Sequence, residues 1–277
     1  MTNGAPSLVS VSPTLGVVLC LLLIAAATVA ALWRLTPGAG TGRGAGGGAH
    51  GGVDDAPGAW RAMLIAGARA ALQLSLVSLV ITWAVTSAAG VLAFVAVMFA
   101  VAVRTAGRRL TANRTGWLTA APIAGSVAPV VAVFLLTGLV PPEGLSLIPV
   151  TGILIGGALT ATVLAGRRAL DELAARRGEV EAALALGFLV RDARWEVARP
   201  AASEALVPGL DQTRTVGLVT LPGAFVGMLL AGASPLMAGA AQLFVLIALM
   251  AVQTVAVAVT TELITRRLLH REGPSGT

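Results

Sequence analysis

The chain has 277 residues, of which 56% are hydrophobic and 12% are charged, and its formal net charge is +6. That charged share is about half of the usual one, and the mean hydropathy of +0.88 excludes an ordinary soluble domain. The basic residues are all arginine and fall in loops beside apolar runs, which argues against nucleic-acid binding. The single cysteine, Cys20, excludes a disulfide framework and a thiolate metal cage.

Repeated apolar runs predict an all-α fold, a polytopic helical membrane protein with about seven transmembrane helices. The first helix lies within residues 1–36, and a Gly-rich tract over 37–59 is typical of a flexible linker. Residues 60–277 form a predicted six-helix transmembrane domain, interrupted by the charged segment 166–214. The predicted spans cover residues 14–33, 63–83, 88–103, 119–139, 147–165, 215–230 and 236–261.

The distribution of arginine predicts the orientation in the membrane. Arginine is in excess in the loops over 34–61, 104–114 and 166–214 and at the C-terminus, and it is absent from the intervening loops. Because cytoplasmic loops carry this excess, we expect the N-terminus outside and the C-terminus inside. The linker and the charged segment are then cytoplasmic.

The charged segment is predicted to be helical. Glu172 precedes Arg176 by four residues, which favours one charged amphipathic helix, and Gly187 is placed to end that helix as its C-terminal cap. A second, shorter helix through Trp195 should end at Pro200. Apolar residues recur at helical spacing in the first part: Leu170, Leu173, Val180 and Leu184.

One motif in this segment resembles the EAA loop of ABC-transporter membrane subunits. Glu181-Ala182-Ala183 is followed by Gly187 and then by Val197-Ala198-Arg199-Pro200, with Arg199 where the motif usually has Leu. The resemblance implies a cytoplasmic helix-turn-helix that docks on a separate ATPase, with Arg176 and Arg177 among the flanking charges that fix the register. An Ala-rich protein can also produce Glu-Ala-Ala by chance, so this alternative stays open.

Residues 152–188 and 216–250 resemble the FetB-type family of ABC permeases, which includes bacterial iron exporters and plant permeases linked to aluminium tolerance. The resemblance covers most of the chain from about Trp60 onward, and the Gly-rich linker looks like an insertion. Gly157 stands where the family has Asn, and residues 226–228 stand where the family has a more polar, Thr-Gly-Gln-like sequence. These departures affect the assignment of iron as the substrate more than the fold. The matching residues are Arg69, Gln73, Leu74, Thr160, Ala161, Leu221, Pro222, Gly223, Gly227, Gly232, Pro235 and Gln242.

The resemblance implies a homodimeric permease in the bacterial inner membrane that exports a metal such as iron. Its energy would come from two copies of an ABC ATPase, where ATP and Mg would bind. This chain has no Gly-rich phosphate loop ending in Gly-Lys-Ser/Thr, so we expect it to bind no cofactor and not to be an enzyme.

The spans hold no catalytic or metal-binding constellation. His50, interpreted as solvated among glycines, and His270 lie outside them, as do the carboxylates, with Glu262 only at a span's cytoplasmic end. Carriers coupled to protons or sodium generally place an ionisable residue inside the membrane. A stand-alone secondary transporter is therefore the weaker alternative; an ABC permease for another small solute and a membrane scaffold without transport also stay open.

Amide, hydroxyl and thioether groups are the candidates for a substrate path. The same residues could instead hydrogen-bond between helices or fill gaps. Pro222-Gly223 is a candidate hinge, because a break in a span frees carbonyls, or an inert kink. The metal ligands are unknown, and the path candidates are Gln73, Thr160, Met228 and Gln242.

Overall fold

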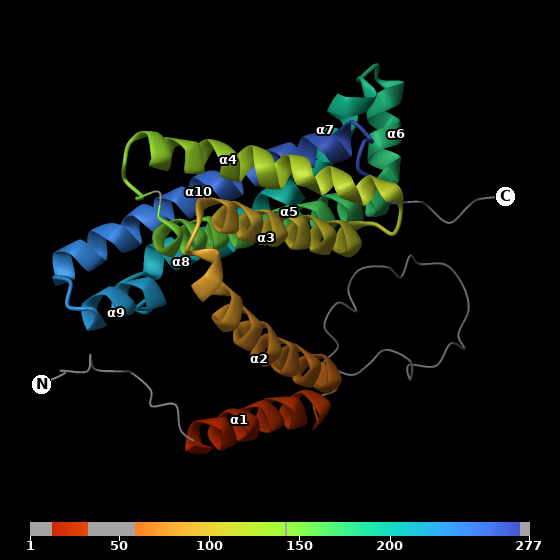
Figure 1. Ribbon diagram of the computed structural model, residues 1–277. Coiled ribbons are helices and arrows are strands. Elements are labelled where there is room, and N and C mark those ends of the chain that lie inside the picture. The colour runs from red at the N-terminus through yellow and green to blue at the C-terminus, as the bar shows by residue number, and fades with distance from the viewer. Residues whose placement is uncertain (1–12, 33–58, 142, 272–277) are drawn as a thin grey trace, which may run out of the picture. The chain divides into compact units, whose positions relative to one another are not determined.

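The computed structural model describes residues 13–32, 59–141 and 143–271. Within these ranges the chain is helical and forms no β-strand, which confirms the predicted all-α class (Figure 1). The predicted linker and His50 lie outside the described residues. The chain divides into two compact units, Met1–Trp83 and Ala84–Thr277.

The first unit contains α1 (Pro13–Leu32) and the main part of α2 (Ala59–Ala84). The two helices meet where Gly67 lies against Leu23: a Cβ atom at Gly67 would come within 2.6 Å of Leu23 Cδ2. The apolar stretch of α1, Gly16–Leu32, is at the short end of the length that spans a bilayer. In α2, 0% of the apolar window is buried, so its surface is left for lipid or for another helix.

The second unit is a bundle of α3 (Ala88–Leu110), α4 (Ala120–Leu136), α5 (Gly144–Ala175) and α10 (Pro235–Thr265), with η1 (Arg114–Thr119) before α4. Helix α5 is central, because it packs against α3, α4, α7 and α10. Alanines let these helices approach closely, as small residues do in membrane bundles. Fully or nearly fully buried examples are Ala161, Ala165 and Ala169 on α5, and Ala248 and Ala256 on α10.

Five described helices are long and apolar enough to cross a membrane. They confirm a polytopic membrane protein, while the total of seven spans and the orientation remain predictions. Helix α5 has 32 residues and is about 48 Å long, against about 30 Å for the hydrocarbon core. Its charged last turns therefore extend beyond the apolar layer.

The predicted span over 215–230 is not a continuous helix. Helix α8 (Val207–Thr215) ends there, residues 216–222 are irregular, and α9 (Gly223–Leu230) has only eight residues. Eight residues cover about 12 Å, which is too short to cross a bilayer. Gly217 has φ +83° and Pro222 precedes the first turn of α9, so the predicted hinge is the start of a short helix rather than a kink in a span.

The charged segment also differs from the prediction. A single helix up to Gly187 is wrong, because α5 ends at Ala175, Arg176 leaves helical geometry (φ −109°, ψ 39°) and α6 (Arg177–Ala185) begins anew. The predicted break at Pro200 is also wrong: α7 (Val190–Ser203) continues through it into η2 (Glu204–Leu206). Proline removes one helical N–H donor, and Pro200 is on the exposed side of α7, where water can reach the freed carbonyl.

Residues 266–271 form a C-terminal strap that folds back from the end of α10. Within the strap, the Leu269 side chain is fully buried (0% exposed), and Arg267 adopts a left-handed conformation with φ +62°. The strap therefore joins the same ends of α3, α5 and α10. Its polar contacts join His270 O to Thr111 Oγ1 and Asn113 Nδ2 (both 3.0 Å), Arg271 Nε to Leu110 O (2.9 Å) and the Arg271 guanidinium to Asp171.

Candidate functional site

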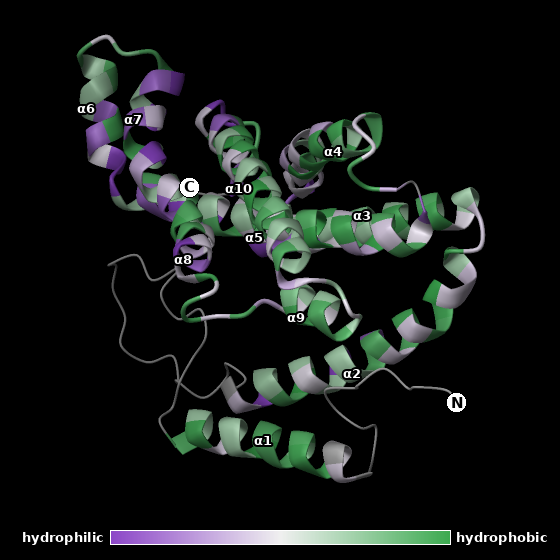
Figure 2. Cartoon of the chain, turned by 90° about the vertical axis from the view of Figure 1, so that its left-hand side faces the viewer, coloured by the Kyte–Doolittle hydropathy of each residue, from purple (hydrophilic) through white to green (hydrophobic). Residues whose placement is uncertain are grey.

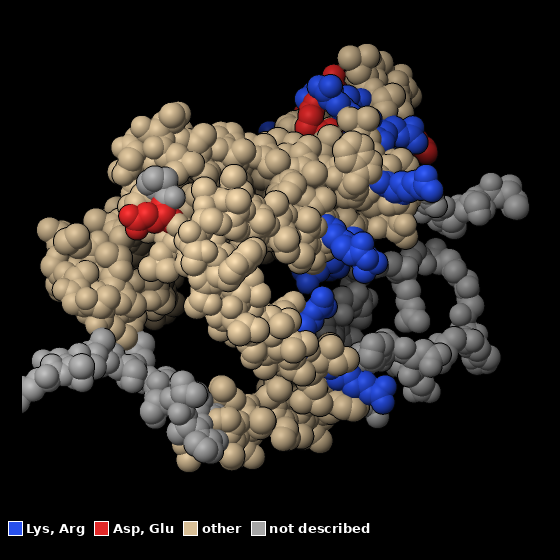
Figure 3. Space-filling view, viewed as in Figure 1, with Lys and Arg blue, Asp and Glu red and all other residues tan. Residues whose placement is uncertain are grey.

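Helices α6 and α7 form a hairpin that projects from the bundle (Figures 1 and 2). They pack against each other, and α7 alone is anchored broadly, on α5 and α10. None of the residues of α6 is buried. Hydrophilic residues concentrate on α6, α7 and α8 (Figure 2), in contrast to the apolar helices of the bundle. Basic and acidic side chains lie together on the projecting hairpin (Figure 3).

The turn of the hairpin depends on Gly187. Its φ of +91° is one that side chains with a Cβ rarely adopt. Phe188 N donates to Ala183 O (3.1 Å) and Gly187 N donates to Leu184 O (3.0 Å), which together form a Schellman motif. The prediction that Gly187 ends this helix is confirmed.

Five apolar side chains form an apolar tip at the turn. Leu186 is 81% exposed and Leu189 is 72% exposed, although the surrounding segment is hydrophilic. A contiguous apolar patch on such a projection is typical of a surface that binds another protein. The tip consists of Leu184, Leu186, Phe188, Leu189 and Val190.

Ion pairs fix the base of α6. The Arg176 guanidinium pairs with Glu172 (3.2 Å) on α5 and with Glu179 (Nε to Oε1, 2.6 Å) on α6, so it bridges the break between the helices. The hydrogen bond from Arg176 lowers the pKa of the Glu179 carboxyl below its usual range. Both groups are solvent-exposed, so the pairs set geometry more than stability.

A bidentate ion pair ties α7 to the end of α10. Arg191 Nε and Nη2 donate to the two carboxylate oxygens of Glu262 at 2.9 and 2.8 Å. The Arg191 guanidinium also lies 5.3 Å from the Trp195 ring centroid, and Arg194 Nη2 donates to Ile264 O (3.0 Å). Bidentate pairs fix orientation as well as distance. These contacts therefore join α7 to the end of α10.

The structure brings the predicted coupling residues together on this hairpin. Within the described part of the chain, Glu181 and Arg177 form no hydrogen bond or ion pair, so both are available to a partner. Sequence reasoning missed the apolar tip. The signal was the apolar run 184–190 inside a segment already assigned outside the membrane. The coupling residues on or beside α6 are Arg176, Arg177, Glu181, Ala182, Ala183 and Gly187.

The four substrate-path candidates have different surroundings in the structure. Gln242 lines a cavity of about 160 Å³ beside Pro222, and its Oε1 is buried without a hydrogen-bond partner. Thr160 is exposed on α5, and its hydroxyl bonds to the Gly156 carbonyl (3.0 Å). Met228 is half-buried on α9, and Gln73 is exposed on α2 in the other unit. The Thr160 hydroxyl therefore bonds within its own helix, so the hydrogen bond to Gly156 supports neither the substrate path nor the alternative of a bond between helices.

No group of three or more His, Cys, Asp or Glu residues that could hold a metal ion occurs among the described residues. The imidazole of His270 lies 3.1 Å from the Arg267 carbonyl oxygen in the strap. The described residues thus leave the identity of a metal ligand set open.

The family model of the uncharacterised protein family UPF0014 matches residues 56–269. The chain belongs to the UPF0014 family. The match begins shortly before α2 and reaches Leu269 in the strap, so α1 lies outside it. The predicted resemblance to FetB-type permeases is confirmed at the level of the family.

Curated relatives of this UPF0014 chain come from plants and bacteria. The UPF0014 membrane protein STAR2 of Oryza sativa subsp. japonica is 37% identical over 204 residues, covering 73% of this chain and 72% of the relative. Protein ALUMINUM SENSITIVE 3 of Arabidopsis thaliana is 31% identical over 204 residues, covering 73% and 75%. The probable iron export permease protein FetB of Escherichia coli is 31% identical over 107 residues, covering 39% and 41%. No solved structure matches.

Proposed function

We propose that this protein is the membrane-spanning permease subunit of an ABC transporter and that a separate ATPase docks on the α6–α7 hairpin. The observation that carries the proposal is the exposed apolar tip. It lies at the end of α6, a helix that has no buried residue, and outside the apolar bundle. Such a surface needs a partner to cover it. The unpaired Glu181 and Arg177 beside it would contribute complementary charge.

Two connections would carry the motion of an ATPase into the membrane. Helix α5 leads from the bundle to the base of α6, and the Arg191–Glu262 pair links α7 to α10. In a homodimer, ATP binding would bring two ATPase subunits together and push the two hairpins toward each other. Helices α5 and α10 would then reorient as rigid elements.

The substrate proposal is export of a metal ion such as iron across the bacterial inner membrane. It rests on the Escherichia coli relative FetB, a probable iron export permease protein. With no carboxylate or histidine cluster in the described spans, the metal would pass by weak amide, hydroxyl and thioether contacts. An ABC permease for a different small solute is the second candidate, and a stand-alone carrier would need no ATPase.

Co-purification tests the ATPase partner. The tagged full chain would be co-expressed with each ABC ATPase subunit of its own genome, and the retained ATPase quantified. Because an aspartate places charge in the apolar tip, we expect Leu186→Asp/Phe188→Asp to abolish retention. Ser203→Asp, on the exposed part of α7, should retain the wild-type amount. If the wild type retains no ATPase, or both variants retain it equally, docking on the tip is refuted.

A further inference from the structure

The end of α3 carries arginines that lack acidic partners. The sequence has no Asp or Glu from residue 56 to residue 142, although six arginines fall there. Arg104 and Arg108 lie one turn apart on α3, are exposed, and form no hydrogen bond or ion pair within the described part of the chain. The arginines of the charged segment and the strap differ, because seven of them do pair with carboxylates: Arg168, Arg176, Arg191, Arg199, Arg214, Arg266 and Arg271.

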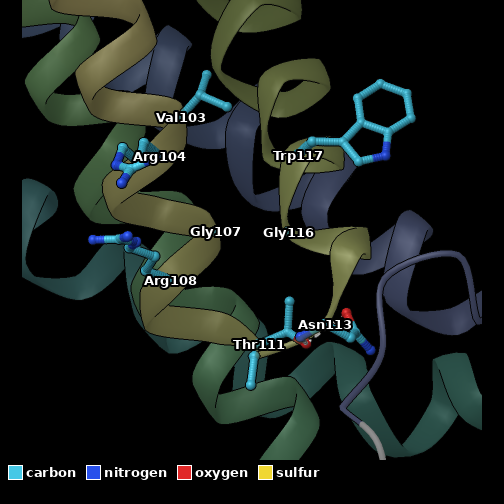
Figure 4. Close-up of a pocket in the computed structure, with 9 residues that line it drawn as sticks. Val103, Arg104, Gly107, Arg108, Thr111, Asn113, Gly116 and Trp117 are labelled. Carbon is cyan, nitrogen blue, oxygen red and sulfur yellow. Dashed lines mark hydrogen bonds between the residues drawn. The ribbon is translucent and has the colours of Figure 1, made fainter.

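These two arginines border a groove between α3 and η1, with a volume of about 290 Å³ (Figure 4). Its floor is backbone, because a Cβ atom at Gly107 would come within 2.6 Å of Gly116 O. In Figure 4, Arg104 and Arg108 extend from the side of α3 that is turned away from η1, and the Trp117 ring projects from the opposite side of η1. We call this the basic groove; its lining residues are Val103, Arg104, Gly107, Arg108, Thr111, Ala112, Asn113, Gly116 and Trp117.

The basic groove lies where two candidate spans end. Ala88–Leu110 finishes at the arginines, and Arg114–Leu136 begins at the other wall. This boundary is at the depth of lipid headgroups, where exposed tryptophan is typical, and Trp117 is 67% exposed. Anionic headgroups attract arginine at the cytoplasmic surface. The depth of the groove in the membrane favours a lipid over an acidic protein surface.

We propose that the basic groove binds the headgroup phosphate of an anionic membrane lipid. The exposed Arg104 and Arg108 side chains turn toward the groove to donate hydrogen bonds to the phosphate oxygens, and the Trp117 ring lies in the same headgroup layer. The absence of a Cβ atom at Gly107 lets α3 and η1 approach closely, so that their backbones close the floor of the groove. The site is independent of the ATPase-docking hairpin, since none of its residues belongs to α6 or α7.

Native mass spectrometry of the delipidated full chain tests the proposal. The protein would be titrated separately with phosphatidylglycerol, phosphatidylcholine and inorganic phosphate. We expect retention of phosphatidylglycerol over phosphatidylcholine, and a preference that falls about fivefold for each arginine removed, or about 25-fold in Arg104→Gln/Arg108→Gln. The control Arg199→Gln/Arg214→Gln removes the same charge from exposed positions and should keep the wild-type preference.

Four results would overturn the proposal. The wild type could show no preference for phosphatidylglycerol, or the two double variants could lose it equally, which would mean that only net charge matters. Inorganic phosphate could displace the lipid at equal concentration, which would indicate a free-anion site. Binding of the ATPase to Arg104→Gln/Arg108→Gln should stay unchanged, which separates this proposal from the hairpin; loss of that binding would assign the groove to the ATPase.

Discussion

Two glycine-to-alanine substitutions on the same hairpin should have opposite effects. Gly187 has φ +91° and Gly178 lies inside α6, and at both positions an added Cβ would meet nothing within 4 Å. Steric clash is therefore absent, and only the backbone conformation differs. Gly187→Ala should cost about 1–2 kcal/mol, because alanine resists this conformation. Gly178→Ala should stabilise α6 by about 0.5–1 kcal/mol.

Hydrogen exchange of the amides in 180–190 measures this difference locally. Because α6 has no buried residue, the hairpin should open without global unfolding. The two variants should differ by about 1.5–3 kcal/mol, so their protection should differ by about tenfold to 100-fold. Equal protection in the two variants, or greater protection in Gly187→Ala, would refute the assignment of the turn to Gly187. Retention of the ATPase should fall in Gly187→Ala and persist in Gly178→Ala.

Three further predictions concern the strap and the base of α6. Leu269→Ala should destabilise the chain by about 2–5 kcal/mol because the side chain is fully buried, whereas Leu268→Ala, 49% exposed, should be nearly neutral in thermal unfolding in detergent. Arg267→Gly should stabilise by about 1 kcal/mol, since glycine relieves the strain at φ +62°; a lower melting temperature would contradict this. Because Arg176 lowers the pKa of Glu179, their pair should persist above the usual glutamate pKa and be lost as pH falls through the lowered one. NMR titration should show this low midpoint in the wild type and a higher one in Arg176→Gln; an unchanged midpoint would exclude the pair.

The sequence predicted those parts of the fold that depend only on neighbouring residues, namely the long apolar helices and the turn at Gly187. Hydropathy located the span-length helices, and Gly187 identified the turn, because a left-handed cap needs glycine. The break at Arg176 could not be predicted in this way. The apolar spacing continues from Leu173 to Val180 across it, while the break depends on how Arg176 bridges carboxylates on two helices.

The sequence predicted where in the chain the candidate site lies, but it did not predict that the apolar side chains there are exposed. Leu186 and Leu189 read as apolar residues, and whether such residues are buried depends on packing from elsewhere in the chain. The same limit explains α9: an apolar composition over 215–230 suits a span as well as a short helix packed on α10. Gln242 was singled out by its chemistry, but its unpartnered amide oxygen is a property of the folded cavity.

The contacts between the strap and α3 can form only late in synthesis of the protein. Thr111 meets the His270 carbonyl across 159 positions of sequence, so the end of α3 lacks this partner until most of the chain has been synthesised. During translation α3 and α4 are therefore inserted before the strap can bond to the end of α3. A chain stalled before Leu269 would present polar groups at the membrane surface that chaperones and proteases can recognise.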